Sequence, residues 1–201
     1  MTGQAQAIGP GPAAVLVGPM GAGKSTAGRS LAQLLGTTFR DTDADIVAAA
    51  GRPIARIFAD EGEPHFRDLE REAVRVALEN HTGVLALGGG AILDADTREL
   101  LAGLPVVFLE VDADEAVRRM AGDASRPLLA VNLRTRWRGL MSERRPLYEE
   151  VARTVVRSDG LSPDTVAERI LDALAPARAE AAAREGRTRP AQPAEPPRMA
   201  R

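Results

Sequence analysis

The feature that most constrains the fold of this chain is a glycine-rich segment, residues 18–25, which reads GPMGAGKS and fits the pattern G-x-x-x-x-G-K-[ST]. It follows a short apolar run, 13–17, typical of a buried strand, and precedes apolar residues at helical spacing over 27–35. A loop between a strand and a helix N-terminus presents backbone N–H groups and the positive end of the helix dipole. The pattern therefore predicts a phosphate-binding loop in an α/β protein.

Among the 26 lysine and arginine residues of the chain, only Lys24 is a lysine, and it lies in this loop. Lysine is a compact charge on a thin stem, whereas arginine ends in a planar fork. We expect Lys24 to reach the β- and γ-phosphates of a nucleotide, and the hydroxyl of Ser25 to coordinate Mg²⁺. The residues expected to bind the phosphates are Gly21, Ala22, Gly23, Lys24, Ser25 and Thr26.

Strand and helix candidates alternate from residue 13 to residue 175. The alternation predicts an α/β fold of three layers, with a parallel five-stranded sheet and helices on both faces. Apolar runs predict strands at 13–17, 38–40, 84–87, 106–111 and 154–156. Apolar spacing predicts helices after the phosphate loop, at 64–80, from 113, at 133–151 and at 163–174.

The two ends of the chain differ in composition from the part between them. Residues 1–12 are rich in Gly, Pro and Gln and are expected to form a flexible segment, whereas 13–175 is expected to form one domain. Residues 176–201 are rich in Ala, Arg, Glu and Pro, with Met199 as their one large apolar side chain. We expect this C-terminal tail to be disordered, with a transient helix around 177–185.

Bulk properties narrow the possible partners of the protein. The formal net charge is −2, which does not favour general binding to nucleic acid, and the absence of cysteine excludes disulfides and cysteine-bound metals. No apolar run approaches the length of a membrane span, and the N-terminus lacks the basic start and apolar core of a signal peptide. We therefore expect a cytoplasmic monomer with no membrane or nucleic-acid partner.

Two carboxylates, Asp41 and Asp43, follow the second strand candidate. In one interpretation Asp43 is only the N-cap of a helix that begins at about Ala44. In the other, both lie at the carboxyl edge of the sheet, where α/β proteins bind ligands. Alternate residues of an extended segment point to one side, so one carboxylate would face Mg²⁺ and the other an acceptor hydroxyl. The local sequence supports both interpretations about equally.

A glycine triplet, Gly88, Gly89 and Gly90, follows the third strand candidate. Such a triplet is a flexible turn, but it also lets a small molecule lie directly against the backbone. Arg67 lies in the first turn of the helix that starts at Pro64. A positive charge there opposes the helix dipole, so a bound anion would help to explain it.

Two further arginines occupy positions suited to anion binding. Arg126 lies in a polar segment between two helices, and such a segment can close over phosphates as a lid. Arg144 precedes Pro146, where its helix is expected to end or kink. Taken singly, each of these arginines is better explained as a solvated surface charge.

Read together and in order, these motifs resemble those of the shikimate kinases. The resemblance covers nearly all of 13–175 and rests on GPMGAGKST, DTDADI, GRPIARIF at 51–58, EGE at 61–63 with Phe66-Arg67, LGGGA, RPLL and RRPLY. It implies the P-loop kinase fold with a mobile lid. It also implies that ATP, with Mg²⁺, phosphorylates the 3-hydroxyl of shikimate on the route to aromatic amino acids.

The resemblance further implies a role for each matching residue. Lys24 and Ser25 would handle the ATP phosphates and Mg²⁺, and Asp41 would hold a water bound to Mg²⁺. Arg119 would lie near the adenine, and Arg126 would be the lid arginine that acts in catalysis with Lys24 and Asp43. Shikimate would be contacted by Asp43, Arg67, Gly88, Gly89, Gly90 and Arg144. The residues at 158–162 lack the basic side chain that some relatives place near the nucleotide.

Elementary chemistry is consistent with these roles. A guanidinium fork can meet both oxygens of a carboxylate such as that of shikimate. Asp43 could accept the proton of a hydroxyl or orient that hydroxyl. Phosphoryl transfer itself needs positioning and charge stabilisation more than covalent catalysis.

Two alternatives remain from the residues alone. The first is another small-molecule kinase, for gluconate or a nucleoside monophosphate, which the combination of DTD, GGG and two separate arginines argues against. The second is a nucleotide-binding regulatory protein, although the guanine-specifying pattern N-K-x-D is absent. His65 and His81 have no partners at ligand spacing, so neither is expected to bind a metal.

Overall fold

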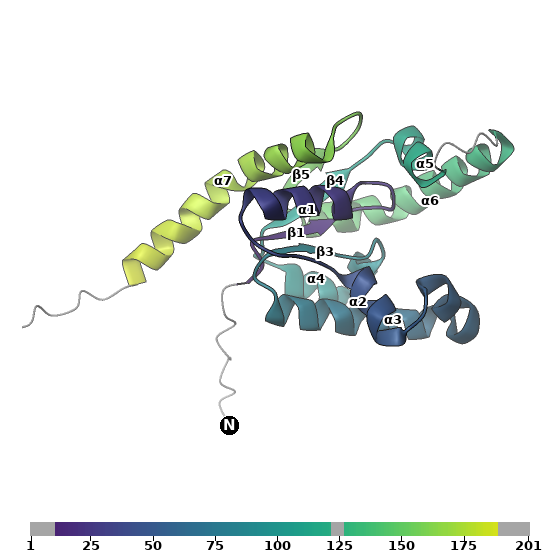
Figure 1. The fold of residues 1–201 in the computed structure, drawn as a ribbon, viewed down its shortest axis with the longest axis horizontal. Helices are drawn as coiled ribbons and strands as arrows, with labels where there is room; N and C mark the ends of the chain where they lie inside the picture. The colour runs from purple at the N-terminus through teal and green to yellow at the C-terminus, as the bar shows by residue number, and fades with distance from the viewer. Residues whose placement is uncertain (1–10, 122–126, 189–201) are drawn as a thin grey trace, which may run out of the picture.

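A parallel sheet forms the centre of the molecule, and its five strands run in the order β2-β3-β1-β4-β5 (Figure 1). The computed structural model describes residues 11–121 and 127–188, and the side chains of 11–120 and 132–175. The central strand β1 pairs in parallel with β3, aligning Val15 with Leu85, and with β4, aligning Leu16 with Val107. The predicted α/β class and parallel five-stranded sheet are therefore confirmed.

The elements alternate along the chain as the sequence predicts. The strands are β1 (Ala14–Val17), β2 (Phe39–Asp41), β3 (Val84–Ala86), β4 (Val106–Glu110) and β5 (Thr154–Arg157). The helices are α1 (Lys24–Leu34), α2 (Thr42–Ala50), α3 (Ile54–Asn80), α4 (Ala95–Leu101), α5 (Ala113–Ala121), α6 (Pro127–Val151) and α7 (Pro163–Thr188), with a short 3₁₀ helix η1 (Ala91–Leu93). Every strand boundary lies within a single residue of the predicted one.

Helices cover the sheet on both faces, which gives three layers. α1 and α7 pack together on one face, while α3 and α4 lie on the other (Figure 1). α6 packs against β4 and η1, and α5 packs against α6. The phosphate loop, the start of α2 and the loop after β3 all follow the carboxyl ends of neighbouring strands, so the topology brings them to one edge of the sheet.

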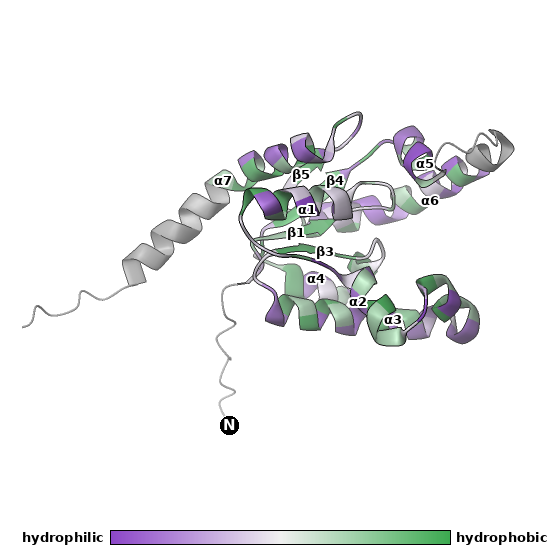
Figure 2. Ribbon diagram, in the orientation of Figure 1, coloured by the Kyte–Doolittle hydropathy of each residue, from purple (hydrophilic) through white to green (hydrophobic). Residues whose placement is uncertain are grey.

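The core is built from β-branched and leucine side chains on the strands, as expected for a sheet that is buried on both faces. All four residues of β1 are buried, and so are Val84, Val106 and Phe108 on its neighbours. Figure 2 shows this hydrophobic centre against the more hydrophilic outer faces of the helices. A second, smaller cluster of Ile46, Ile57 and Phe66 joins α2 to α3.

Three helices differ from their predicted extents. α3 starts at Ile54 rather than at Pro64, because a first helical segment precedes Gly62, whose φ of 83° and ψ of 173° break the helix geometry. The half after this break is the helix that the sequence predicts. α6 starts at Pro127 rather than at 133 and reaches its expected end at Val151. It runs through Pro146, so of the end or kink expected at that proline, the end is wrong.

The third difference concerns the C-terminus. α7 continues to Thr188, past the expected domain boundary at residue 175. The proposed flexible character of 1–12 and of the tail remains a prediction, and residues 1–10 and 189–201 lie outside the described part of the chain.

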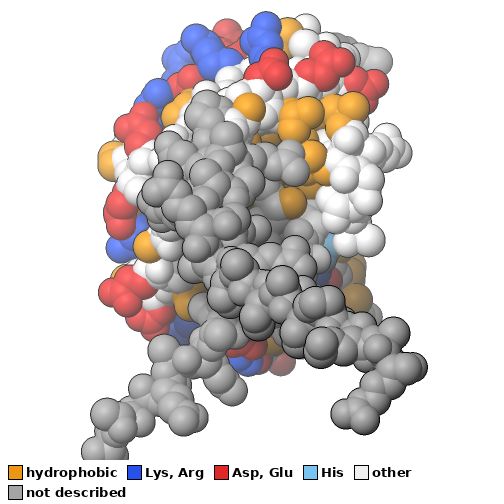
Figure 3. Space-filling model, turned by 90° about the vertical axis from the view of Figure 1, so that its left-hand side faces the viewer, with side chains coloured by type: hydrophobic (Ala, Val, Ile, Leu, Met, Phe, Trp, Pro, Cys, Tyr) orange, Lys and Arg blue, Asp and Glu red, His pale blue; other side chains and the backbone are white. Residues whose placement is uncertain are grey.

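The described surface carries charges of both signs. In the face shown in Figure 3, acidic and basic side chains are interspersed around the rim. Many arginines pair with nearby carboxylates, as Arg75 does with Glu72 and Glu79 at 2.7 Å. Within the described ranges, no helix combines the length and the apolar character needed to cross a membrane.

Candidate active site

The loop between β1 and α1 has a backbone that requires glycine. Gly21 and Gly23 have φ values of 83° and 88°, a region that other residues rarely adopt. A Cβ atom on Gly21 would also lie 2.8 Å from the carbonyl oxygen of Ala116, and one on Gly18 would lie 2.5 Å from that of Leu109. The loop is thus pressed against β4 and α5, and its shape depends on the missing side chains.

Lys24 begins α1 and folds back over the loop. Its Nζ donates hydrogen bonds of 2.8 Å to the carbonyl of Gly18 and 3.1 Å to that of Pro19. Burial lowers the pKa of this ammonium group, and the negative charges of Asp43 and Asp41 oppose that shift. The lysine therefore places its charge within the loop and in the electrostatic reach of both aspartates.

Asp41 joins the phosphate loop to the start of α2. Its Oδ2 accepts a 2.6 Å hydrogen bond from the Ser25 hydroxyl, and its Oδ1 accepts one of 3.0 Å from the backbone N–H of Asp43. Asp41 is therefore the N-cap of α2, and the interpretation that gave this role to Asp43 is wrong. The hydroxyl of Ser25 and the carboxylate of Asp41 are hard oxygen donors placed side by side, a pair that suits Mg²⁺.

Asp43 lies in the first turn of α2, so the argument from an extended segment does not hold. The capping turn instead directs Asp43 toward the glycine triplet, where a Cβ on Gly88 would lie 2.5 Å from Asp43 Oδ1. Burial raises the pKa of the Asp43 carboxyl, and the charge of Asp41 raises it further against the opposing effects of Lys24 and Arg67. Asp43 is thus a carboxylate with increased proton affinity that lies beside the glycine triplet.

Arg67 is held by two glutamates of its own helix. Its Nη1 donates to Glu70 Oε2 at 2.6 Å, and its Nε and Nη2 donate to Glu63 Oε1 at 3.2 and 2.8 Å. These neighbours offset the positive charge of Arg67 within its own helix, and the expected contact with an anion stays a prediction. A guanidinium has five N–H donors, so these bonds leave donors for a ligand.

The side chain of Glu70 was not singled out by the sequence. It is 3% exposed, and burial raises its pKa while Arg67 lowers it. Its spacing of three residues from Arg67 was the available signal, but that spacing is common on solvated helices. Only its burial distinguishes it as the partner that fixes the Arg67 guanidinium.

The glycine triplet leaves room for the charged side chains around it, because it has no side chains of its own. A Cβ on Gly88 would meet Glu70 Oε1 at 2.6 Å, and a Cβ on Gly90 would come within 2.9 Å of Arg67 Cζ. Gly89 faces the phosphate loop, since its Cβ would lie 3.5 Å from the carbonyl oxygen of Gly18. The triplet therefore admits the carboxylates and the guanidinium to the pocket.

α6 supplies the opposite wall. Arg144 Nη1 donates to the carbonyl oxygen of Gly89 at 3.3 Å, and the Tyr148 hydroxyl donates to the same oxygen at 2.6 Å. Trp137, earlier on the helix, donates its indole N–H to the carbonyl of Met20 at 3.2 Å. One helix thus contacts both the phosphate loop and the glycine triplet.

These elements enclose a cavity of about 430 Å³ beside the phosphate loop. This acceptor pocket brings together most of the predicted substrate-binding residues, with apolar side chains around them. Its lining includes Met20, Asp43, Phe58, Phe66, Arg67, Glu70, Gly89, Gly90, Trp137 and Arg144. The volume suits a small polar molecule rather than a macromolecule.

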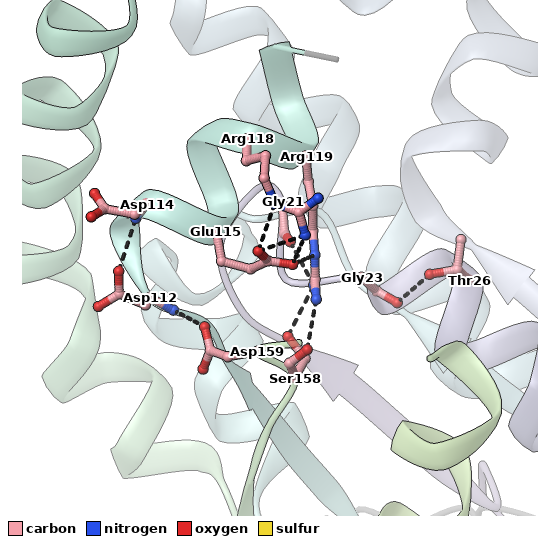
Figure 4. A network of polar contacts seen from close by, with 10 residues as sticks. All are labelled: Gly21, Gly23, Thr26, Asp112, Asp114, Glu115, Arg118, Arg119, Ser158 and Asp159. Carbon is pink, nitrogen blue, oxygen red and sulfur yellow. Dashed lines mark hydrogen bonds and ion pairs between the residues drawn. The ribbon is translucent and has the colours of Figure 1, made fainter. Parts of the chain in front are cut away.

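A second cavity of about 360 Å³ lies on the other side of the phosphate loop. The lining of this nucleotide pocket includes Arg119, which extends from α5 past Gly21 to Ser158, the residue after β5 (Figure 4). Its Nη1 donates to the carbonyl of Gly21 and to Ser158 Oγ, both at 3.1 Å, and its Nη2 donates to the carbonyl of Ser158 at 2.6 Å. Glu115 accepts from its Nε at 2.8 Å.

The remaining predicted residues are placed as follows. Thr26 bonds the carbonyl of Gly23 at 3.0 Å and lines the nucleotide pocket together with Ala22 and Gly23. Arg126 lies outside the described residues, so its predicted role in a lid stays a prediction. His65 pairs with Glu61 at 3.2 Å. The described residues hold no group of three or more His, Asp or Glu side chains that could bind a metal.

Comparison with known proteins supplies the family. The sequence model described as shikimate kinase matches residues 20–175. A shikimate kinase of Streptomyces coelicolor is 64% identical over 163 residues, which are 81% of this chain and 95% of that protein. The shikimate kinase of Salinispora arenicola is 54% identical over 164 residues, 82% of this chain and 98% of that protein.

Solved structures agree in fold. A shikimate kinase from Acinetobacter baumannii, in complex with shikimate, has a TM-score of 0.75 and 40% identity, covering 82% of this chain and 93% of its own. A gluconokinase from Sinorhizobium meliloti has a TM-score of 0.55 and 19% identity over 87% of this chain and 97% of its own, a likeness of fold alone. The chain belongs to the shikimate kinase family.

Proposed function

We propose that the protein transfers the γ-phosphate of ATP to the 3-hydroxyl of shikimate, giving shikimate 3-phosphate for the synthesis of aromatic amino acids. The observation that carries the proposal is the acceptor pocket. It combines Asp43, a carboxylate of raised pKa that is not paired with an arginine of its own helix, with two arginines, Arg67 and Arg144, from different helices. A small carboxylate with hydroxyl groups matches this set of charges.

ATP would lie across the phosphate loop, with its base in the nucleotide pocket beside Arg119. The glycine backbone and Lys24 would hold the phosphates, and Lys24 would exchange its bonds to the loop carbonyls for bonds to phosphate oxygens. Ser25 would bind Mg²⁺ directly, and Asp41 would hold it through a water. When bound, Mg²⁺ neutralises charge that develops on the phosphate oxygens.

Asp43 would act on the acceptor hydroxyl. A carboxylate whose pKa is raised is a stronger base than an ordinary one, so it can accept the hydroxyl proton or orient the oxygen toward the phosphate. The proton would pass from the 3-hydroxyl oxygen to an Asp43 oxygen while that hydroxyl oxygen bonds to the γ-phosphorus of ATP. The bond from that phosphorus to the β–γ bridging oxygen would break, and ADP would leave. The positive charge of Lys24 lies close enough to Asp43 to lower its pKa, so the residue that would hold the phosphates lies near the one that would act on the hydroxyl.

Arg67 and Arg144 would bind the carboxylate of shikimate. Glu63 and Glu70 hold Arg67, and the carbonyl of Gly89 holds Arg144, so both guanidinium groups are oriented before the substrate arrives. Preorganised groups lose little conformational freedom on binding. Gly88, Gly89 and Gly90 would give the substrate its backbone contacts, and Arg126 would close over the phosphates. We expect the enzyme to act as a cytoplasmic monomer.

A panel assay tests the reaction. Production of ADP should be measured with ATP and Mg²⁺ in the presence of shikimate, gluconate or a nucleoside monophosphate. We expect turnover with shikimate alone. Equal or faster turnover with gluconate would overturn the proposal, and slow hydrolysis that no acceptor stimulates would favour a nucleotide-binding regulatory protein.

The methyl ester of shikimate tests the carboxylate contact. A hydrogen bond to a charged group contributes about 1.5–3 kcal/mol, so the ester should have a kcat/KM lower by roughly tenfold to a hundredfold or more. Arg67→Ala and Arg144→Ala should each reduce kcat/KM for the acid by a similar factor and affect the ester much less, because the ester has already lost the contact. Equal use of acid and ester by the parent enzyme would exclude the carboxylate contact.

A further inference from the structure

Tyr148 is a buried polar residue that contacts Gly89, a lining residue of the acceptor pocket, and that the proposed reaction does not use. Its side chain is 0% exposed, and its ring stacks on Phe108 of β4 with centroids 5.0 Å apart. The ring by itself would serve as packing. The hydroxyl, however, reaches the glycine triplet and donates to the carbonyl oxygen of Gly89 at 2.6 Å.

The same carbonyl oxygen also accepts a hydrogen bond from Arg144, one helical turn earlier on α6, whose Nη1 lies 3.3 Å from it. A carbonyl oxygen has two lone pairs, so it can accept from both side chains at once. Tyr148 and Arg144 therefore converge on one oxygen of the glycine triplet, and the shorter bond is the one from Tyr148.

The glycine triplet needs such an anchor. Three glycines in succession restrict the backbone least, so hydrogen bonds decide how their peptide groups are oriented. The carbonyl of Gly88 accepts from Ala91 N at 3.1 Å, and that of Gly90 accepts from Leu93 N at 2.9 Å. These two carbonyls are fixed by N–H groups of η1. The carbonyl of Gly89 instead points to α6, where it is held by Tyr148 and Arg144.

We propose that Tyr148 is a positioning residue for the substrate carboxylate, since its hydroxyl fixes the Gly89 peptide whose carbonyl oxygen also binds the guanidinium of Arg144. The inference rests on the proposed function of the acceptor pocket. It assigns the ring to stability and the hydroxyl to substrate binding, and these two contributions can be separated by mutation. Burial raises the Tyr148 pKa to about 12, so the hydroxyl keeps its proton and remains a donor at neutral pH.

Tyr148→Phe removes the hydroxyl and keeps the ring. We expect KM for shikimate to rise by roughly tenfold, the upper range for one lost hydrogen bond, with KM for ATP within about twofold of the parent value. The preference for shikimate over its methyl ester should fall by a similar factor, because Arg144 would no longer be held toward the carboxylate. Tm should fall by only about 2–4 °C.

Phe108→Leu is the matched control, because it removes the stacked partner and leaves the Tyr148 hydroxyl. This variant should lower Tm while it keeps the parent preference for the acid over the ester. A general loosening of the fold would lower the preference for the acid over the ester in both variants. A positioning role of the hydroxyl would lower that preference in Tyr148→Phe alone.

The outcomes distinguish this inference from the proposed function. If the parent prefers the acid and Tyr148→Phe retains the full preference and the parent KM for shikimate, Tyr148 has no positioning role. If the parent itself does not distinguish acid from ester, the carboxylate contact is excluded and this inference with it. A loss of preference in Phe108→Leu equal to that in Tyr148→Phe would assign the effect to packing.

Discussion

The Ser25 hydroxyl donates a 2.6 Å hydrogen bond to Asp41 Oδ2, although the two residues are 16 positions apart in the sequence. The other oxygen of Asp41 caps α2 at the N–H of Asp43. Asp41 therefore ties the phosphate loop to the helix that carries the proposed base. This placement also puts its negative charge near Asp43, where it contributes to the raised pKa.

Replacing Asp41 should change how activity depends on pH. Asp41→Asn keeps an oxygen that can cap α2 but removes the charge that helps to raise the Asp43 pKa. The pKa of Asp43 should fall toward its ordinary value, so the acidic limb of kcat/KM for shikimate should move to lower pH. The pH dependence of kcat/KM should be measured for the parent, for Asp41→Asn and for the control Asp45→Asn. The Asp45 carboxylate pairs with Arg40. An unmoved limb in Asp41→Asn would contradict the prediction.

Lys24→Arg should lose activity although it keeps the charge. Nζ of Lys24 lies between two loop carbonyls at 2.8 and 3.1 Å, a space for one nitrogen rather than a planar fork. We expect kcat/KM to fall by at least about a hundredfold, some 2.7 kcal/mol. Measured at saturating ATP, the arginine variant should be nearly as slow as Lys24→Met. Activity within a few-fold of the parent would show that charge alone suffices.

Asp43→Asn should stabilise the protein while it removes turnover. Because the folded-state pKa of Asp43 lies above its unfolded value, protonation favours the folded state, and stability falls as pH rises from the unfolded pKa through the folded one. At pH 7 the partial burial of an ionisable carboxyl group lowers the stability of the parent, and the amide variant has no such group. Tm should therefore rise at pH 7, and the gain should vanish below about pH 4, where both forms are neutral.

The same variant should lose about a hundredfold or more in kcat, with little change in ATP affinity. Thermal melts at pH 7 and pH 4, together with initial rates, test both parts. A lower Tm at pH 7, or a full kcat, would show that Asp43 is a structural carboxylate rather than the proposed base.

Gly90→Ala should displace Arg67. The backbone of Gly90, with φ of −101° and ψ of −9°, is open to alanine, but the new Cβ would lie 2.9 Å from Arg67 Cζ. We expect KM for shikimate to rise by about tenfold or more, with KM for ATP nearly unchanged. Gly139→Ala on α6 is the control, since its Cβ would meet nothing within 4 Å and alanine favours a helix by about 1 kcal/mol. A parental KM for shikimate in Gly90→Ala would mean that Arg67 does not bind the substrate.

Removing residues 176–201 should leave activity and Tm almost unchanged. Leu174, 2% exposed, is the last residue of the core within the described side chains, and the sequence beyond it is poor in large apolar residues. A longer deletion that begins after Arg169 also removes Ile170 and Leu174, and buried residues of this kind contribute about 2–5 kcal/mol each. The longer deletion should unfold. A large loss of Tm in the shorter one would show that the tail stabilises the domain.

Much of the fold follows from local sequence patterns. Most strands could be located to within a residue because short apolar runs, such as those that end before Gly18 and Gly88, have few alternatives in a parallel sheet. The phosphate loop was equally clear, since Gly21 and Gly23 meet a local backbone requirement that any fold around them must satisfy. By contrast, the break at Gly62 inside α3 and the passage of α6 through Pro146 depend on packing that overrides these local signals.

The sequence by itself determined the fold class, the phosphate loop and three charged residues of the acceptor pocket, Asp43, Arg67 and Arg144. Only the tertiary structure decided which of these residues meet. Glu70 is ordinary in the sequence and becomes the buried partner of Arg67 once α3 packs beside the glycine triplet. Likewise Arg144 and Tyr148 converge on Gly89, more than 50 positions away, because α6 crosses the carboxyl edge of the sheet. Spacing along the chain carries no record of such distant contacts, which arise when separate helices pack on one sheet.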